Sequence, residues 1–377
     1  MRRIALLIVR SVVLAFIILV SLEFLFRLAG LGQPLLQTFP LAEEQAGILQ
    51  FDSKLFWSLH PGFKGISYDG TFVTINQLGH RGAETREKET GEFRILSLGE
   101  SSTFGVRVSD AETYSARLED LLRRKAGSSR ITIINAGVPA YSSFQSLKFL
   151  ELRGLQLRPD LVLFYHEVND YLPSSVRDST QDELGITRTD KQLYESRARQ
   201  ASSFLMAHSA FFRFLVRSDA VRRIQRFNTN DVQNTLAQIG LPAIGLGPRV
   251  RDAKRVGLNE AALGRRVSDD ERRENLCELA SLCRQEGIGL IVIHPSYRDS
   301  VSHECVLTHF CREQNVAMFD AFPFLHPLDL EPGSLFNDRD YWHPNAEGHR
   351  RLAEGLAAFI IERGFISKER RAAEAKE

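Results

Sequence analysis

A serine in the first third of the chain and a histidine near its end have the surroundings of a nucleophile and its base. Ser101 follows the apolar run Phe93–Leu98 after a Gly-Glu dipeptide, and Asp340 lies three residues before His343. A serine at a turn between a strand and a helix exposes its hydroxyl at the edge of a sheet. An aspartate can orient an imidazole that deprotonates such a hydroxyl. Together these residues predict a serine hydrolase or acyltransferase.

Short apolar runs alternate with amphipathic stretches in the region that must position these residues. The runs predicted to form strands are Phe93–Leu98, Ile131–Ile134, Leu161–Tyr165, Ile288–His294 and Val316–Phe319. The stretches predicted to form helices are Glu112–Lys125, Phe144–Leu155, Asp269–Glu286, Val301–Glu313 and Ala346–Arg363. This alternation is typical of a parallel sheet that helices cover on both faces.

Polar residues follow the carboxyl ends of three predicted strands and precede the last helix. Ser101 follows the first strand, the segment 135–143 the second and Asn169 the third, while His343 comes just before the final helix. In an open parallel sheet, ligands bind outside the carboxyl ends of the strands. We therefore expect Ser101, Asn169 and His343 to meet at one edge of the sheet.

Four segments in this order resemble the SGNH (GDSL-like) hydrolase family and, more narrowly, its membrane-anchored bacterial members. They are Gly99–Gly105 (GESSTFG), 135–139 (NAGVP), 166–170 (HEVND) and His343–His349 (HPNAEGH). The resemblance spans nearly all of residues 93–358. It implies an α/β fold: a three-layer α/β/α sandwich with a parallel, flavodoxin-like sheet of about five strands.

The resemblance also implies a role for each matching residue. Ser101 is the nucleophile, and His343 is the general base that later protonates the leaving group. Asp340 fixes the tautomer of His343. The oxyanion hole consists of the backbone N–H groups of Ser101 and Ala140 and the side-chain amide of Asn169, which stabilise charge that develops in the transition state. No cofactor or metal is implied.

Other residues near these segments compete for a place in the site. Ser102 is a second serine at the turn, but Ser101 matches the position of the nucleophile. His166 and His294 lie at strand ends, where we expect structural hydrogen bonds close to the site, and we expect His349 on a helix face.

Three residues depart from the family's pattern. Glu100 replaces the usual Asp at a position without a direct chemical role, and Ala140 adds a methyl group where the oxyanion glycine normally lies. Glu167 replaces the usual Gly two residues before Asn169, and a carboxylate there opposes an oxyanion unless it points away or is paired. These departures leave open a catalytically weak protein that keeps the fold for binding or assembly.

The first 30 residues have the features of an uncleaved signal anchor. Residues 4–22 are apolar apart from Arg10 and two serines, and about 20 helical residues cross a hydrocarbon core. In residues 26–30, Arg or Leu stands where a small-x-small cleavage site needs a small residue. Arg2, Arg3 and Arg10 outnumber Arg27. We expect a single-pass inner-membrane protein with a cytoplasmic N-terminus and an extracytoplasmic or periplasmic catalytic domain.

The remaining chain is expected to divide into three regions. A stalk and N-terminal extension covers 31–90, and the SGNH hydrolase domain covers 91–366, with a helical insertion or cap at 171–266. A charged tail covers 367–377. Within the insertion, the arginines of Phe211–Phe227 are read as a solvated helix face in preference to a surface for anionic lipid or an acidic polymer. The charged stretch 81–91 is expected to be exposed.

The chain has four cysteines close together in sequence: Cys277, Cys283, Cys305 and Cys311. In an exported domain they would form one or two disulfides, and the alternative is four buried small apolar residues. A metal site at Cys305 and His309, with His303 and Cys311 nearby, matches no strong zinc pattern, so no metal is expected.

The overall charge is nearly balanced, with 48 Lys and Arg against 47 Asp and Glu, so nothing favours nucleic acid as a partner. The predicted function is a membrane-tethered serine esterase or acylhydrolase that acts through an acyl-Ser101 intermediate on O-acyl groups of envelope glycans or lipids. An O-acyltransferase to a polysaccharide would use the same site. The expected partners are the acylated substrate, the membrane through the N-terminal helix, and a membrane O-acyltransferase.

Overall fold

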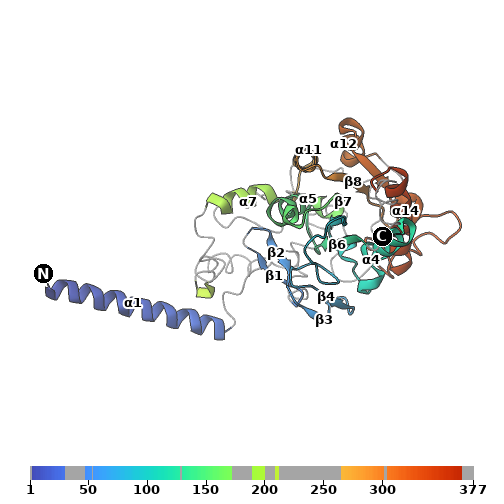
Figure 1. The fold of residues 1–377 in the computed structure, drawn as a ribbon. Coiled ribbons are helices and arrows are strands. Elements are labelled where there is room, and N and C mark those ends of the chain that lie inside the picture. The colour runs from blue at the N-terminus through green and yellow to red at the C-terminus, as the bar shows by residue number, and fades with distance from the viewer. Residues whose placement is uncertain are drawn as a thin grey trace.

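The computed structural model of this protein describes residues 2–29, 47–52, 54–127, 130–171, 189–199, 209–211, 265–300 and 304–366. Its N-terminal part contains one helix and two antiparallel strand pairs (Figure 1). These elements are α1 (Arg2–Leu28), β1 (Leu49–Asp52), β2 (Phe56–Leu59), β3 (Lys64–Ile66) and β4 (Phe72–Thr74).

The rest of the described chain alternates between strands and helices. The strands are β5 (Phe93–Gly99), β6 (Ile131–Gly137), β7 (Leu161–Tyr165), β8 (Gly289–His294) and β9 (Ala317–Asp320). The longer helices are α4 (Tyr114–Ala126), α5 (Ser143–Phe149), α7 (Asp190–Arg199), α11 (Asp269–Gln285), α12 (Val306–Gln314) and α14 (Ala346–Glu362). The short helical turns are α3 (Ser101–Phe104), η1 (Asp110–Glu112), η2 (Leu150–Gly154), η3 (Leu155–Leu157), α6 (Val168–Tyr171) and α13 (Phe322–Leu325).

The five strands β5 to β9 form one parallel sheet in the order β6-β5-β7-β8-β9. The predicted parallel α/β sheet of about five strands is therefore confirmed, and its order is the flavodoxin-like one. The strand order reverses between β5 and β7. Because ligands bind at such a switch point, the ends of β5 and β7 are where a site is expected.

Helices cover both faces of the sheet, which gives three layers. Along β7, Leu161, Leu163 and Tyr165 pack with α4 and α14, whereas Val162 and Phe164 pack with α5, α11 and α12. Side chains of a strand point alternately to its two faces, so a run that is apolar at every position buries both.

The N-terminal strand pairs pack on the turn that follows β6. The indole N–H of Trp57 donates to the Pro139 carbonyl (3.0 Å), and the Tyr141 hydroxyl donates to the Trp57 carbonyl (2.7 Å). The Gln145 amide donates to the Leu55 carbonyl (2.8 Å). The N-terminal extension thus fixes the segment after β6, which contains the predicted oxyanion-hole residue Ala140.

Two predictions concern the N-terminal helix and the insertion at 171–266. In Figure 1, α1 extends away from the sheet, but no helix among the described residues has both the length and the apolar character that crossing a membrane requires. The predicted transmembrane anchor is therefore not supported.

Of the predicted insertion at 171–266, α7 is helical, and most of the remainder, including nearly all of Phe211–Phe227, lies outside the described residues.

Candidate active site

A tight turn after β5 places Ser101 at the start of α3. A Cβ atom at Gly99 would lie 2.0 Å from Thr103 Oγ1 and 2.9 Å from the Tyr165 carbonyl oxygen, so no larger residue fits there. Glu100 is extended (φ −104°, ψ −150°), and the helix begins at the next residue. The chain therefore reverses sharply and leaves the Ser101 side chain at the carboxyl edge of the sheet, as predicted from the sequence.

Arg81 stabilises the turn at α3 through hydrogen bonds, although the sequence suggested that residues 81–91 are exposed. Its side chain is buried and donates to the Phe104 carbonyl (2.6 Å) and to the carbonyls of Gly105 and Val108. It also pairs with Asp110 at 2.8 Å. The expectation of exposure was wrong for this residue, because the guanidinium satisfies carbonyls that the end of a short helix leaves without partners.

Ser101, His343 and Asp340 form a continuous chain of hydrogen bonds. Ser101 Oγ lies 2.8 Å from His343 Nε2, and His343 Nδ1 lies 2.7 Å from Asp340 Oδ2. An ionised carboxylate only accepts, so Nδ1–H donates to Asp340 and Nε2 is left to accept the serine proton. The residues that the sequence placed about 240 positions apart are in contact.

The charges around the hydrogen-bonded Ser101, His343 and Asp340 favour proton uptake by His343. Burial lowers the pKa of His343, but the hydrogen bond and negative charge of Asp340 and the charge of Glu100 outweigh burial and raise that pKa above its usual value of 6.5. Burial raises the pKa of Asp340, but His343 more than offsets this and holds that pKa below its usual value. Asp340 is therefore ionised wherever His343 works as a base.

The loop that carries Asp340 and His343 is held by two residues that the sequence did not single out. Arg298 donates from Nε to the Asp340 carbonyl (2.9 Å) and from Nη2 to the Asn337 carbonyl (2.7 Å). The Asn337 amide donates to the His343 carbonyl (3.2 Å). Neither residue belongs to a recognisable motif, because the bonds that they make are to backbone atoms.

Ala140 lies in a turn that requires an unusual backbone conformation. The Tyr141 N–H donates to the Val138 carbonyl (3.1 Å), Pro139 comes second in the turn and Ala140 third, with φ of +63°. A positive φ at the third position is typical of a type II turn, where glycine is preferred. Arg266 donates to the Ala140 carbonyl (2.6 Å), so the conformation is fixed from the other side.

Asn169 lies beside Ser101, but its amide is engaged by other groups. Nδ2 donates to Glu100 Oε2 (2.5 Å) and to the Tyr141 carbonyl (3.0 Å). Because an amide nitrogen carries only two hydrogens, neither is left for a substrate in this arrangement. Glu100, which was expected to have no direct chemical role, has its carboxyl group within the site, with Oε2 3.4 Å from Ser101 Oγ.

Burial changes the titration of Glu100. It raises the pKa of this carboxyl group to about 7, although the charge of His343 acts in the opposite direction and the charge of Asp170 adds to the increase. Near neutral pH the group therefore exists in both protonation states. Protonation removes the negative charge that Glu100 places next to the amide of Asn169.

The competing residues make other contacts. Ser102 is buried and its hydroxyl faces the Trp342 carbonyl (3.5 Å), while His166 Nε2 lies 2.7 Å from Ser146 Oγ. His349 lies on a buried face of α14, and its Nδ1 accepts from the Tyr114 N–H (3.1 Å). None of these three reaches His343 through a hydrogen bond among the described residues.

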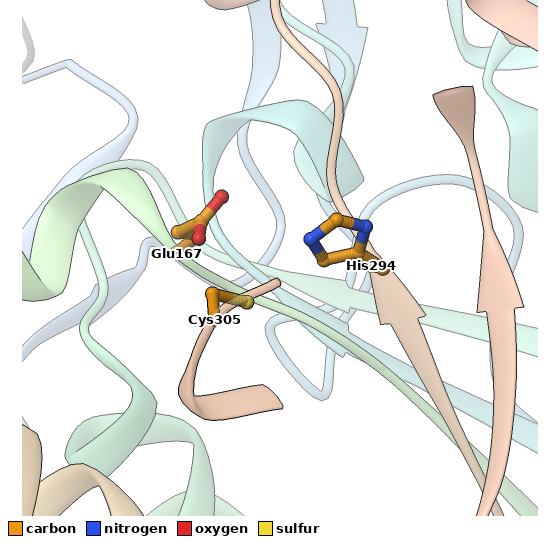
Figure 2. Close-up of side chains that lie close together, drawn as sticks. All are labelled: Glu167, His294 and Cys305. Carbon is orange, nitrogen blue, oxygen red and sulfur yellow. The ribbon is translucent and has the colours of Figure 1, made fainter. Parts of the chain in front are cut away.

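The cysteines are not linked. All four thiols are free, which contradicts the disulfide alternative, and Cys283 and Cys311 are buried, as the apolar alternative requires. His309 bonds to Glu304 (2.8 Å) on the surface, so it does not join a site with Cys305, and His303 lies outside the described residues. Figure 2 shows instead that Cys305 faces Glu167 and His294.

A parallel α/β sheet with a hydrogen-bonded Ser-His-Asp set at its carboxyl edge defines the class of serine hydrolases. The family model of the GDSL-like Lipase/Acylhydrolase proteins matches residues 95–356. The chain therefore belongs to this family, as the motifs indicated, and is a serine ester hydrolase.

Solved structures show a more distant similarity. An α/β hydrolase, LAE5, from the metagenome of Lake Arreo is 14% identical with a TM-score of 0.41, covering 71% of this chain and 94% of that one. A catalytic mutant of Axe2, an acetylxylan esterase from Geobacillus stearothermophilus, is 14% identical with a TM-score of 0.41, covering 73% and 96%. These scores carry no argument about substrate. No curated protein matches the chain.

Proposed function

We propose that this protein hydrolyses an ester through an acyl-Ser101 intermediate, with His343 as the general base and Asp340 as the group that orients it. The observation that carries the proposal is the pair of hydrogen bonds that joins Ser101 Oγ, His343 and Asp340, at 2.8 and 2.7 Å. These distances lie in the range that proton transfer to a general base requires.

The reaction has two halves that use the same base. Ser101 Oγ attacks the ester carbonyl carbon while His343 Nε2 takes the serine proton, and the proton passes to the alcohol oxygen as the C–O bond of the ester breaks. Water then attacks the acyl-serine, losing a proton to His343. Collapse of this intermediate releases the carboxylic acid and restores the Ser101 hydroxyl.

Negative charge on the carbonyl oxygen would be stabilised by the N–H groups of Ser101 and Ala140. The amide of Asn169 adds a third donor once the carboxyl group of Glu100 withdraws from it. Each such donor contributes about 2.7–4 kcal/mol to transition-state stabilisation. Asn169 thus acts in the proposed mechanism only after a local rearrangement.

The substrate class is proposed to be an O-acyl group on an envelope glycan or lipid. Membership of an acylhydrolase family supports ester chemistry. The extracytoplasmic, membrane-tethered location and the partnership with a membrane O-acyltransferase are predictions from the sequence alone. The chemistry at Ser101 does not depend on either.

The test is hydrolysis of p-nitrophenyl acetate by the full chain and by Ser101→Ala. We expect the substitution to lower kcat/KM by about three orders of magnitude or more. Ser102→Ala is the matched control and should retain most of the activity, because among the described residues that buried hydroxyl hydrogen-bonds only to the Trp342 carbonyl. Equal rates for Ser101→Ala and wild type would refute the assignment. Adding a glycan acceptor to the assay separates transfer from hydrolysis.

A further inference from the structure

Three side chains of the kinds that bind transition metals meet next to the active site. They come from separate segments: Glu167 follows β7, His294 ends β8, and Cys305 caps the start of α12. One ligand atom of each lies within 4.8 Å of the other two. In Figure 2 the Glu167 carboxylate, the Cys305 sulfur and one ring nitrogen of His294 point toward one another. Glu167 and His294 are 5% and 3% exposed, so water screens the cluster poorly.

A fourth residue orients the imidazole. Asp320 pairs with His294 across the β8–β9 ladder, and its Oδ1 lies 3.4 Å from His294 Nδ1. A proton on Nδ1 that is donated to Asp320 leaves Nε2 as the nitrogen with a lone pair, and Nε2 is the atom that faces the cluster. Histidines that bind metals almost always donate their other ring N–H to a carboxylate or carbonyl in this way.

The donor set matches one kind of ion better than others. A thiolate and an imidazole favour zinc over calcium or magnesium, which prefer oxygen ligands alone. With the thiolate and the carboxylate ionised, the two negative charges balance a divalent cation. Tetrahedral zinc places sulfur and nitrogen ligands about 3.5 Å apart, so small side-chain rotations would close the observed spacing.

The buried guanidinium of Arg272 interacts with the charge of Glu167 but is directed elsewhere. Arg272 is fully buried, and its three nitrogens contact other groups: the Asp170 carboxylate (3.3 Å), the Tyr171 hydroxyl (2.6 Å) and the His166 carbonyl (3.0 Å). The guanidinium therefore does not fill the centre of the cluster. A cavity of about 770 Å³ is lined in part by His294 and Asp320.

The same geometry also resembles a Cys-His-Asp catalytic set, with Cys305 as a nucleophile. Such a set gives the carboxylate of Glu167 no part, whereas a metal ion uses it as a third ligand beside the sulfur and the imidazole. The composition of the cluster thus favours an ion over a second nucleophile.

We propose that Glu167, His294 and Cys305 bind a zinc ion, with Asp320 as the residue that orients His294. Binding displaces the proton that the thiol would otherwise hold. The ion joins the ends of β7 and β8 to the start of α12. It also draws the charge of Glu167 away from Asn169, two residues further along the chain, which removes the conflict that this carboxylate poses for an oxyanion.

The experiment measures zinc in the purified full chain after removal of metal with a chelator and dialysis against zinc chloride. We expect about one zinc per chain, and loss of stoichiometric binding in Cys305→Ser and His294→Gln. Cys311→Ser, on the same helix, should bind zinc like wild type. Asp320→Asn changes a side chain that is 39% exposed, so it should fold and bind zinc about 10–100-fold more weakly.

A second measurement needs no variant at the site. Zinc should protect Cys305 of the wild-type chain from alkylation by iodoacetamide, as followed by peptide mass spectrometry. Equal zinc content in wild type and Cys305→Ser, or alkylation of Cys305 at the same rate with and without zinc, would overturn the proposal. Ser101→Ala should bind zinc normally, so failure of the proposed hydrolase and failure of the zinc site are separate outcomes.

Discussion

At the scale of single residues, the carboxyl group of Glu100 competes with a substrate oxyanion for the amide of Asn169. The 2.5 Å contact between Glu100 Oε2 and Asn169 Nδ2 is the bond that must break before the amide can serve the reaction. Glu100 also raises the pKa of His343 through its negative charge. One substitution at this residue should therefore change both oxyanion stabilisation and the pH dependence of the base.

We expect kcat/KM to rise with pH through a pKa above 6.5. Below this pKa His343 Nε2 holds a proton and cannot accept another from Ser101, and the structure raises the pKa of His343. Glu100→Gln removes a negative charge that contributes to this increase, so the rising limb should move to lower pH, by up to about 1 unit. The measurement is the pH profile of p-nitrophenyl acetate hydrolysis.

The matched control is Glu331→Gln, which neutralises an exposed carboxylate on a loop and should leave the profile unchanged. A limb that stays in place or moves to higher pH in Glu100→Gln would show that the charge of Glu100 does not act on His343. Because Glu100 and His343 interact, the limb reports the pair and not either residue alone.

At the scale of elements, α3 is a single turn of helix whose position depends on a residue that precedes the sheet. Arg81 donates to three carbonyls at or just beyond the end of this turn and pairs with Asp110. A four-residue helix cannot stabilise itself, because most of its backbone groups lack helical partners. The nucleophile is therefore held by contacts that are distant in sequence.

Arg81→Met should lower the free energy of unfolding by about 3 kcal/mol, because it removes hydrogen bonds to three carbonyls and the ion pair with Asp110. It should also lower kcat/KM, since the turn that carries Ser101 loosens. Urea unfolding and the ester assay measure the two effects. Arg86→Met is the control at an exposed position and should stay within about 0.5 kcal/mol of wild type. Equal stability of both variants would contradict the role of Arg81.

The elements of the sheet were predictable from the sequence, whereas several of their supports were not. Buried parallel strands are apolar at most positions, and this signal located all five strands within a few residues of their observed bounds. Arg81 gave no such signal, because it lies in a charged stretch and its partners are backbone carbonyls. Arg298 and Asn337 escaped prediction for the same physical reason.

At the scale of the whole molecule, the sheet brings together residues from the full length of the domain. The positions of Ser101, Asn169 and His343 could be predicted because each follows a strand or precedes a helix in a known order. The cluster of Glu167, His294 and Cys305 could not, since it depends on how the loop before α12 returns to the end of β8. The engagement of Asn169 by Glu100 likewise depends on side-chain directions that no sequence pattern encodes.

The most direct test of the central claim is to treat the full chain with a fluorophosphonate and locate the adduct by peptide mass spectrometry. The reagent phosphonylates a serine whose proton a neighbouring base removes. We predict a single adduct on Ser101, formed faster as pH rises through the pKa of His343. It should be lost in Ser101→Ala and retained in Ser102→Ala. An adduct on another serine, or none in the folded wild-type chain, would contradict the account.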